Sequence, residues 1–340
     1  PPSAADAVNR ISRDRAEEIL ERASTVRVLV VGDLMLDRYL TGSVDRISPE
    51  APVPVVRVEE ERWALGGAGN VAANVVALSA TCDVVGGVGD DPEGRLLRDS
   101  LAELGVGVEG LVPLTGRPTT VKTRIMARHQ HVTRIDREDA SDINAHESAR
   151  VAEIIQTLGA SAASIALEDY NKGILVSPVI RTTLAVGRET GAPTVVDPKR
   201  LRFFEFAGAT VFKPNARELE DALGERLRPD DPDWMSRVRG RLACHTLLLT
   251  LGEAGMAVQA KEEQLMRVPT VARDVYDVSG AGDTVTAVMA VALAAGATSL
   301  EAAVLANHAA AVEVGKAGVA TVSPDEILDQ LTALAEKERR

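Results

Sequence analysis

A short segment rich in glycine, Asp277–Thr284 (DVSGAGDT), contains the residues whose types and spacing most clearly suggest chemistry. Gly280 and Gly282 precede Asp283, and the apolar run that follows, residues 284–295, favours a helix. N–H groups at a helix N-terminus have no partner within the helix and attract an anion such as phosphate. A carboxylate at the same place can accept a proton from an attacking hydroxyl. The segment therefore predicts phosphoryl transfer to an alcohol, although a tight turn with Asp283 as an ordinary N-cap also fits it.

A second glycine-rich segment, Gly67–Ala72, formally matches the dinucleotide-binding pattern G-x-G-x-x-A. That pattern requires a buried strand before it, whereas charged residues 59–62 and Trp63 precede it here. The context therefore disfavours a dehydrogenase. The loop glycines and Asn70 can instead contact a polyhydroxy substrate through backbone N–H and amide groups.

Asn215 and Glu218 are three residues apart, which places an amide and a carboxylate on one face of a helix's first turn. Oxygen ligands at this position can hold a hydrated Mg²⁺ ion that bridges substrate phosphates. The same spacing also fits a capping box, in which Asn215 caps the helix and Glu218 bonds back to it. Gly252 and Gly255, which follow Thr250, either approach a nucleotide phosphate or form a turn.

These residues follow apolar runs that predict a parallel sheet. Residues 26–31 form a β-branched run that ends in Gly32 and Asp33, and near-continuous apolar character is typical of a central parallel strand. Acids at the carboxyl ends of such strands lie where α/β sheets bind ligands, so Asp33 and Asp37 are candidate site residues. Apolar runs followed by polar or glycine residues recur at residues 164–167, 193–196, 210–212 and 246–250.

Two half-polar segments, about residues 40–62 and 117–136, depart from this pattern. Both alternate apolar with polar residues, and prolines interrupt the first, which is typical of exposed or edge strands. We expect them to form a small sheet set apart from the core, which serves as a lid. Residues 9–23 predict a surface helix outside the main sheet.

The composition restricts the class of partner. Of the 340 residues, 45% are hydrophobic and 3% aromatic, which predicts a sizeable aliphatic core. The formal net charge of −12 argues against nucleic acid as the main partner. Cys82 and Cys244 have no disulfide or metal spacing and are expected to be buried thiols. No signal peptide is visible and the longest apolar run is too short to cross a membrane, so we expect a cytoplasmic protein without a membrane partner.

Taken together, these segments resemble the PfkB (ribokinase-like) family of carbohydrate kinases. Residues 277–284 are similar to the C-terminal signature of that family, and the block from Gly66 to Asp90 is similar to its N-terminal signature. Asn215 and Glu218 match the magnesium motif of the family. The resemblance covers about residues 26–325, and two long signatures in the right order are not expected by chance.

Within the family, the resemblance extends to the branch that phosphorylates the anomeric hydroxyl of a heptose 7-phosphate in lipopolysaccharide core synthesis. It rests on residues 32–40, 46–54 and 118–124. In two-domain members of that branch, a nucleotidyltransferase follows the kinase. The sequence ends at Arg340 without one, so we expect a stand-alone kinase.

The resemblance implies a three-layer αβα sandwich with a mainly parallel central sheet and a small β-sheet lid. We expect an N-terminal helical extension over residues 1–25 and a kinase domain over residues 26–340, with lid segments at about 40–62 and 117–136. Family members often dimerise through the lid, which predicts a homodimer. The resemblance also implies that the reaction uses ATP and Mg²⁺.

The resemblance further implies roles for individual residues. Asp283 would take the proton of the sugar hydroxyl, and the N–H groups of Gly280, Ala281 and Gly282 would stabilise charge on the transferred phosphoryl group. Mg²⁺ would be held, through water, by Asn215 and Glu218. The implied sugar-binding residues are Asp33, Gly66, Gly67 and Asn70. The implied nucleotide-binding residues are Lys213, Asn215, Thr250, Gly252, Gly255 and Asn307.

A phosphate group on the substrate requires local cations in an acidic protein. We predict that Lys172 and Arg124 bind it, because arginine can pair with phosphate bidentately, and we interpret Arg46 and Arg128 as surface cations. Two alternatives stay open, namely a kinase for another sugar or sugar phosphate and a non-catalytic sugar-binding regulator on the same fold. The presence of Asp283 argues against the regulator, because a binding protein does not need the base.

Overall fold

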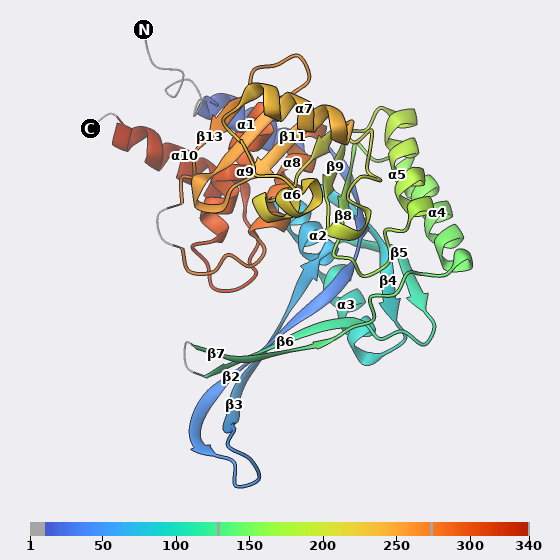
Figure 1. Ribbon diagram of the computed structural model, residues 1–340, viewed down its shortest axis with the longest axis vertical. Helices are drawn as coiled ribbons and strands as arrows, with labels where there is room; N and C mark the ends of the chain where they lie inside the picture. The colour runs from blue at the N-terminus through green and yellow to red at the C-terminus, as the bar shows by residue number, and fades with distance from the viewer. Residues whose placement is uncertain (1–10, 128–129, 273–274, 339–340) are drawn as a thin grey trace.

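The computed structural model describes residues 11–127, 130–272 and 275–338, and its centre is a nine-stranded sheet (Figure 1). The strands are β1 (Arg27–Gly32), β4 (Thr81–Gly89), β5 (Gly107–Leu114), β8 (Ser164–Glu168), β9 (Thr194–Asp197), β10 (Val211–Phe212), β11 (Thr246–Thr250), β12 (Met256–Ala260) and β13 (Met266–Val268). Their order is β13-β12-β11-β10-β9-β8-β1-β4-β5. The pairs from β11 to β5 are parallel, and β12 and β13 join antiparallel at one edge.

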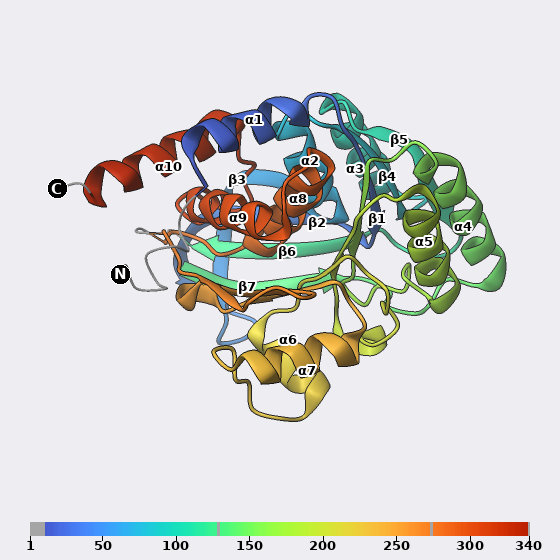
Figure 2. The ribbon, with the colours of Figure 1, turned by 90° about the horizontal axis from the view of Figure 1, so that it is seen from above.

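Helices cover both faces of this sheet (Figure 2). On one face lie α1 (Arg13–Ala23), α2 (Ala68–Ala77), α3 (Pro92–Glu103), α8 (Ala281–Ala294), α9 (Ser299–Glu313) and α10 (Pro324–Glu338). On the other lie α4 (Ala145–Gly159), α5 (Ser177–Thr190), α6 (Ala216–Leu223) and α7 (Pro232–Leu242). The single-turn helices η2 (Arg200–Arg202) and η3 (Gly252–Ala254) lie in connecting segments.

The central strands are apolar throughout because both of their faces are buried. Successive side chains of a strand point to opposite faces, so Val28 and Val30 pack into the core beneath α2 and α8. Leu29 and Val31 pack into the second core, beneath α4 and α5. This arrangement confirms the predicted αβα architecture. Cys82 and Cys244 are buried free thiols, as expected.

Helix α1 packs against the first core. Ile19 is fully buried, and Arg15 pairs with Glu301 at the start of α9 across 2.9 Å. The predicted surface helix thus buries one side and exposes the other. None of the described helices is long and apolar enough to span a membrane.

A four-stranded sheet projects from the main body in Figure 1. It contains β2 (Leu34–Ile47), β3 (Pro54–Gly67), β6 (Thr120–Ala127) and β7 (Gln130–Arg137), in the order β3-β2-β6-β7. We call this sheet the lid. Strands β2 and β3 are longer than the predicted segment 40–62, because β2 begins only two residues after β1 and β3 runs directly into α2. The base of the lid is therefore continuous with the core.

Candidate active site

Asp283 lies in the first turn of α8 and is 4% exposed. Gly280 is the N-cap of this helix, with a φ of 98° that favours glycine. A Cβ atom at this position would lie 3.0 Å from Asn70 Nδ2 and 3.1 Å from Glu313 Oε1. The glycine therefore lets the turn approach its neighbours closely and holds the carboxylate at the helix terminus.

The turn before Asp283 presents backbone donors. Ala281 N–H makes only a long bond, of 3.5 Å, to the Val278 carbonyl. Within the part of the chain that the structure describes, the N–H groups of Gly280 and Gly282 make no hydrogen bond. Unpaired N–H groups at the positive end of a helix dipole are suited to an anion. The predicted phosphoryl-stabilising residues thus share one turn with Asp283.

Two side chains hold the Asp283 carboxylate. Asn70 on α2 donates from Nδ2 to Oδ2 across 2.9 Å, and the Tyr170 hydroxyl donates to Oδ1 across 2.8 Å. Burial raises the pKa of Asp283 to about 6, whereas these two hydrogen bonds oppose the rise because they stabilise the charged form. Asp283 is therefore ionised near neutral pH, as a proton acceptor must be.

Tyr170 was not predicted from the sequence as a site residue. It follows the end of β8 in the segment Glu168–Gly173. Two lysine ammonium groups lie near its ring, that of Lys122 at 4.9 Å and that of Lys199 at 5.1 Å from the centroid. The position directly after a buried strand was a signal that could have identified it. Its partner Asn70 was predicted to contact sugar, and its amide orientation is fixed by Asn74, which donates to Asn70 Oδ1 across 3.1 Å.

Two further buried carboxylates, Glu168 and Asp197, lie at the ends of β8 and β9. Among the described residues, they and Asp283 form a group in which one oxygen of each lies within 4.8 Å of the others. Lys213, predicted as a nucleotide-binding residue, pairs with Asp197 across 2.7 Å and is itself buried. Burial raises the pKa of Glu168 well above its ordinary value, as do the neighbouring charges of Asp197 and Asp283, so the site favours the uncharged form of Glu168.

Asn215 and Glu218 form the capping box at the start of α6. Asn215 Oδ1 accepts from Glu218 N–H across 2.9 Å, and Glu218 Oε2 accepts from Asn215 N–H across 2.8 Å. The second Glu218 oxygen pairs with Lys199 across 2.5 Å, and Lys199 also reaches Asp197 across 3.7 Å. Oxygen donors beside a strand end fit Mg²⁺ that is held through water. Direct coordination by Glu218 fits less well, because the cap and the lysine already engage both of its oxygens.

The predicted sugar-binding residues lie between β1 and the base of the lid. Asp33 is fully buried, and its carboxylate accepts backbone N–H groups from Tyr170 at 2.8 Å, Lys172 at 2.9 Å and Ile174 at 3.2 Å. Burial raises the pKa of Asp33, and the three hydrogen bonds oppose this rise. Asp33 therefore fixes the loop that carries Tyr170. Oδ1 accepts only the bond from Ile174, so it retains an acceptor position, and the predicted sugar contact of Asp33 stays a prediction.

The glycines of the segment before α2 bring a different carboxylate into the site. A Cβ atom on Gly66 would lie 2.8 Å from Asp37 Oδ2, and one on Gly67, whose φ is 57°, would lie 2.5 Å from the Asp33 carbonyl oxygen. Asp37 is 5% exposed and pairs with Arg124 on β6. The Asp37 carboxylate thus lies against Gly66, one of the predicted sugar-binding glycines.

Both cations that were predicted to bind a substrate phosphate have carboxylate partners. Arg124 pairs with Asp37, and Lys172 pairs with Glu138 across 2.8 Å. Arg46 lies at the exposed end of β2, as interpreted from the sequence. Arg128 lies outside the described residues.

The predicted nucleotide-binding residues lie along the ends of β10 and β11 and on α9. An isolated bridge pairs Asn215 with Thr250 and so joins the magnesium motif to the end of β11. Gly252 and Gly255 have positive φ values of 59° and 78° in the turn before β12. Asn307, on α9, donates to the Pro269 carbonyl across 2.8 Å and lies farther along this edge, beside the segment after β13.

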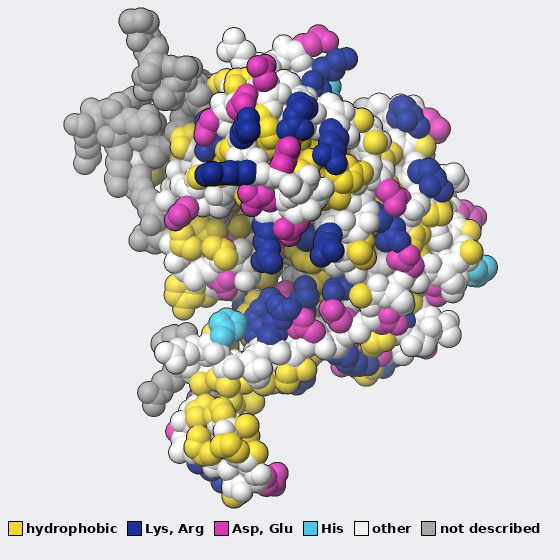
Figure 3. Space-filling view, viewed as in Figure 1, with side chains coloured by type: hydrophobic (Ala, Val, Ile, Leu, Met, Phe, Trp, Pro, Cys, Tyr) yellow, Lys and Arg dark blue, Asp and Glu magenta, His cyan; other side chains and the backbone are white. Residues whose placement is uncertain are grey.

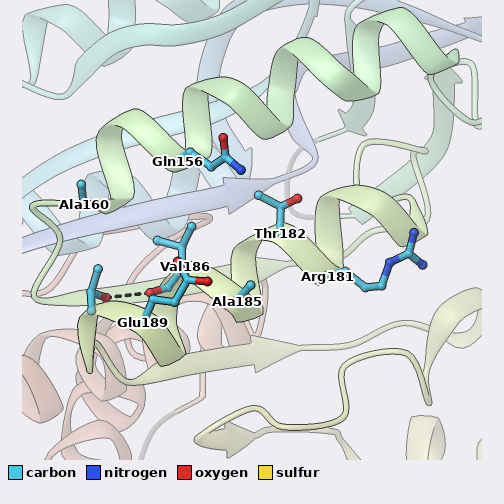
Figure 4. Close-up of a pocket in the computed structure, with 8 residues that line it drawn as sticks. Gln156, Ala160, Arg181, Thr182, Ala185, Val186 and Glu189 are labelled. Atoms are coloured by element: carbon cyan, nitrogen blue, oxygen red, sulfur yellow. Dashed lines mark hydrogen bonds between the residues drawn. The ribbon is translucent and has the colours of Figure 1, made fainter.

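Another depression lies between α4 and α5 (Figure 4). It is lined near the ends of these helices by residues such as Ala160 and Thr190, from which the chain enters β8 and β9. Its lining also includes Arg181 and Thr182 near the start of α5, so it extends along that helix, and it contains none of the predicted site residues. We therefore place the candidate active site at the carboxyl ends of the strands, beneath the lid.

Comparison with known sequences identifies the family of the chain. A sequence profile described as "pfkB family carbohydrate kinase" matches residues 26–326. Relatives named "Bifunctional protein HldE" include those of Citrifermentans bemidjiense, 43% identical over 324 residues, and Geobacter sulfurreducens, 41% identical over 325 residues. Each alignment covers 94% of this chain but only 66% of the relative. The chain thus spans about two thirds of the length of these relatives.

Solved structures are similar in fold. Phosphofructokinase-2 from Escherichia coli in complex with potassium has a TM-score of 0.77 at 18% identity, covering 91% of this chain and 99% of that one. Arabidopsis thaliana ribokinase complexed with ribose and ATP has a TM-score of 0.71 at 20% identity, covering 90% and 98%. At these identities, the comparisons show the ribokinase-like fold.

Proposed function

The chain belongs to the pfkB family of carbohydrate kinases, and we propose that it phosphorylates the anomeric hydroxyl of D-glycero-β-D-manno-heptose 7-phosphate with ATP. The product would be the 1,7-bisphosphate, a precursor in ADP-heptose and lipopolysaccharide inner-core biosynthesis. The observation that carries the kinase chemistry is the buried Asp283 carboxylate beside N–H groups of the same helix turn. The resemblance of residues 32–40, 46–54 and 118–124 to the heptose-phosphate branch supports the choice of sugar.

In this mechanism, Asp283 acts as the general base. The anomeric hydroxyl would replace one of the two donors on its carboxylate, Tyr170 or Asn70, and then transfer its proton to the oxygen that it contacts. Because the pKa of Asp283 is about 6, the carboxylate is free of a proton at neutral pH and yet basic enough to accept one during the reaction.

The turn at Gly280–Gly282 would stabilise the charge that develops on the transferred phosphoryl group. Its N–H groups are fixed by the start of α8 before substrate arrives, so little reorganisation is needed. Lys213 lies beside this turn, since a Cβ atom on Gly282 would be 3.7 Å from Lys213 Nζ. We propose that the Lys213 ammonium adds positive charge at the same place while it neutralises Asp197.

We propose that Asn215 and Glu218 hold Mg²⁺ through water. The bound ion would neutralise part of the charge on the ATP phosphates. The capping box that joins the two residues keeps them in fixed orientations, and Lys199 limits the net negative charge of the site. Thr250, Gly252 and Gly255 would approach the nucleotide phosphates, and Asn307 would lie on the adenine side.

For the sugar, we propose contacts with Gly66, Gly67 and Asn70, as the sequence predicted, and with Asp37. Asp37 is the buried carboxylate that lies against Gly66, and a charged acceptor for sugar hydroxyls discriminates strongly when it is buried. Asp33 would contribute by fixing the loop after β8.

We also propose a homodimer formed through the lid. The lid exposes large apolar side chains, with exposed fractions of 61% for Ile47, 47% for Val58 and 55% for Ile135. Figure 3 shows apolar surface gathered toward the free end of the lid. Apolar side chains on an otherwise charged sheet are typical of a surface that is covered in an assembly.

The test is ADP release from Mg²⁺-ATP with a panel of acceptors that includes the heptose 7-phosphate and fructose 6-phosphate. A strong preference for the heptose 7-phosphate is expected. A preference for fructose 6-phosphate would still support the kinase chemistry. It would favour the first alternative, a kinase for another sugar phosphate. Sugar binding without turnover of any acceptor would favour the other alternative, a regulator on this fold.

A further inference from the structure

The face of the lid that is turned toward the active site carries a concentration of cations. Side chains two residues apart on a strand share a face, so Lys122 and Arg124 lie together on β6. In the register of the neighbouring strand β7, Asp136 lies directly opposite Lys122, and Arg134 lies directly opposite Arg124. Two like charges directly opposite each other disfavour the sheet. Figure 3 shows lysine and arginine side chains gathered where the lid meets the body.

All but one of these cations form an ion pair with a neighbouring carboxylate. Arg124 pairs with Asp37, and Arg134 pairs with Asp136 across 2.6 Å. The neighbouring Lys172, on the loop after β8, pairs with Glu138 across 2.8 Å. The remaining cation of this group is Lys122.

Lys122 has no carboxylate partner among the residues that the structure describes. Its ammonium group makes one hydrogen bond, to Met35 Sδ across 3.0 Å, and a thioether is a weak acceptor. Its pKa is lowered by burial and by the nearby charges of Lys172 and Arg134, and the carboxylates of Asp37 and Glu138 oppose this shift. A partly buried ammonium group without an anion is costly, which suggests that an anion completes this site.

The position of Lys122 relative to the base fits one end of a sugar phosphate. Its ammonium lies 4.9 Å from the centroid of the Tyr170 ring, and the hydroxyl of that ring bonds to Asp283 across 2.8 Å. One tyrosine ring therefore separates Lys122 from the base. A sugar whose reacting hydroxyl lies at Asp283 would extend toward the inner face of the lid, where Lys122 is located.

We propose that Lys122, flanked by Arg124 and Arg134 on the inner face of the lid, binds the phosphate group of a phosphorylated sugar substrate. This inference rests on the proposed sugar-phosphate kinase function and adds the residue that selects phosphorylated acceptors. It also revises the expectation from the sequence, because Arg124 and Lys172 are already neutralised by Asp37 and Glu138, whereas Lys122 is not. A phosphate dianion would replace the weak sulfur acceptor of Lys122 with a charged one.

The test compares Lys122→Met with the unchanged protein on two acceptors, the heptose 7-phosphate and the same heptose without its phosphate. Loss of a charged hydrogen bond to phosphate is expected to raise KM for the phosphorylated acceptor about 10- to 100-fold. For the unphosphorylated acceptor, KM is expected to stay the same, as is kcat for both acceptors. Inorganic phosphate is expected to inhibit the unchanged protein competitively and Lys122→Met more weakly by the same factor.

Lys172→Met is the matched control, because it removes a neighbouring ammonium group that already has a carboxylate partner. Its KM for the phosphorylated acceptor is expected to rise less than about fivefold. Lys122→Arg, which keeps the charge, is expected to retain most of the selectivity for phosphorylated acceptors. If Lys122→Met does not fold, Lys122→Gln serves for the same comparison.

Equal losses on both acceptors, or an unchanged KM for the phosphorylated one, would overturn the role of Lys122 while leaving the proposed function in place. A protein that uses the free heptose as well as its 7-phosphate would overturn the proposed substrate itself. The second result is obtained with the unchanged protein alone, so the two failures are distinguishable.

Discussion

The Tyr170 hydroxyl sets the pH at which the base becomes active, and replacement of Tyr170 by phenylalanine tests this directly. The hydroxyl donates to Asp283 Oδ1 across 2.8 Å and so stabilises the ionised carboxylate. Phenylalanine keeps the ring on which Lys122 lies and removes only the donor. Because the charged form loses a hydrogen bond, the pKa of Asp283 must rise.

The size of the rise follows from the energy of that hydrogen bond. A bond to a charged group contributes about 1.5–3 kcal/mol, and one pKa unit corresponds to about 1.4 kcal/mol. Asn70 continues to donate to the other oxygen, and water replaces part of the lost bond. We therefore expect the pKa of Asp283 to rise from about 6 by roughly one unit.

The measurement is kcat/KM for the sugar phosphate as a function of pH, whose acid limb reports the ionisation of the base in the free enzyme. Activity should fall on the acid side near pH 6 in the unchanged protein and roughly one unit higher in Tyr170→Phe. Tyr39→Phe is the matched control, because this lid tyrosine has a buried hydroxyl without a partner among the described residues. An acid limb that stays in place in Tyr170→Phe, or that moves equally in Tyr39→Phe, would refute the reasoning.

Three further variants test other parts of the site and the lid. Asp283→Asn should lower kcat by about 10²- to 10⁴-fold. The same variant should raise the melting temperature more at pH 8 than at pH 4. The native pKa of about 6 lies above the ordinary value of 3.8, so the buried charge of Asp283 lowers stability at pH 8 but not at pH 4. An equal gain at both pH values would contradict this account. Arg124→Met should lower the free energy of unfolding in urea by about 3 kcal/mol, because it leaves the buried Asp37 without its partner. The control Arg95→Met, in an exposed ion pair, should change that free energy by less than about 0.5 kcal/mol. Similar losses of stability in the two variants would argue against a structural ion pair between Arg124 and Asp37. Ile135→Glu should convert the proposed dimer to monomer in sedimentation velocity, and a persistent dimer would place the interface elsewhere.

Local patterns in the sequence were sufficient to predict the features that depend on neighbouring residues. The Gly-Ala-Gly-Asp segment determines the start of α8 because the glycine at 280 must adopt a positive φ. The spacing of Asn215 and Glu218 determines the capping box of α6. The apolar runs determine the central strands, because a strand buried on both faces needs apolar side chains at successive positions.

The boundaries of the lid were less accessible to prediction. Residues 34–36 are buried and apolar like a core strand, yet they belong to β2. Their hydrophobic pattern reports burial and does not distinguish between two sheets. The pairing of β2 with β3 and β6, which assigns them to the lid, involves residues far apart in the chain.

The sequence by itself determined the family, the αβα architecture, and the position of Asp283 at a helix terminus, since these follow from contiguous motifs and from periodicity. Only the tertiary structure decided which side chains meet. It showed that the Tyr170 hydroxyl donates to Asp283 and that the Asp33 carboxylate accepts backbone N–H groups of the loop after β8. It also showed that Lys122, among the described residues, lacks the carboxylate partner that Arg124 has. The physical reason is that charge pairing and hydrogen bonding act over a few ångströms, between residues that the fold brings together from 87 to 137 positions apart.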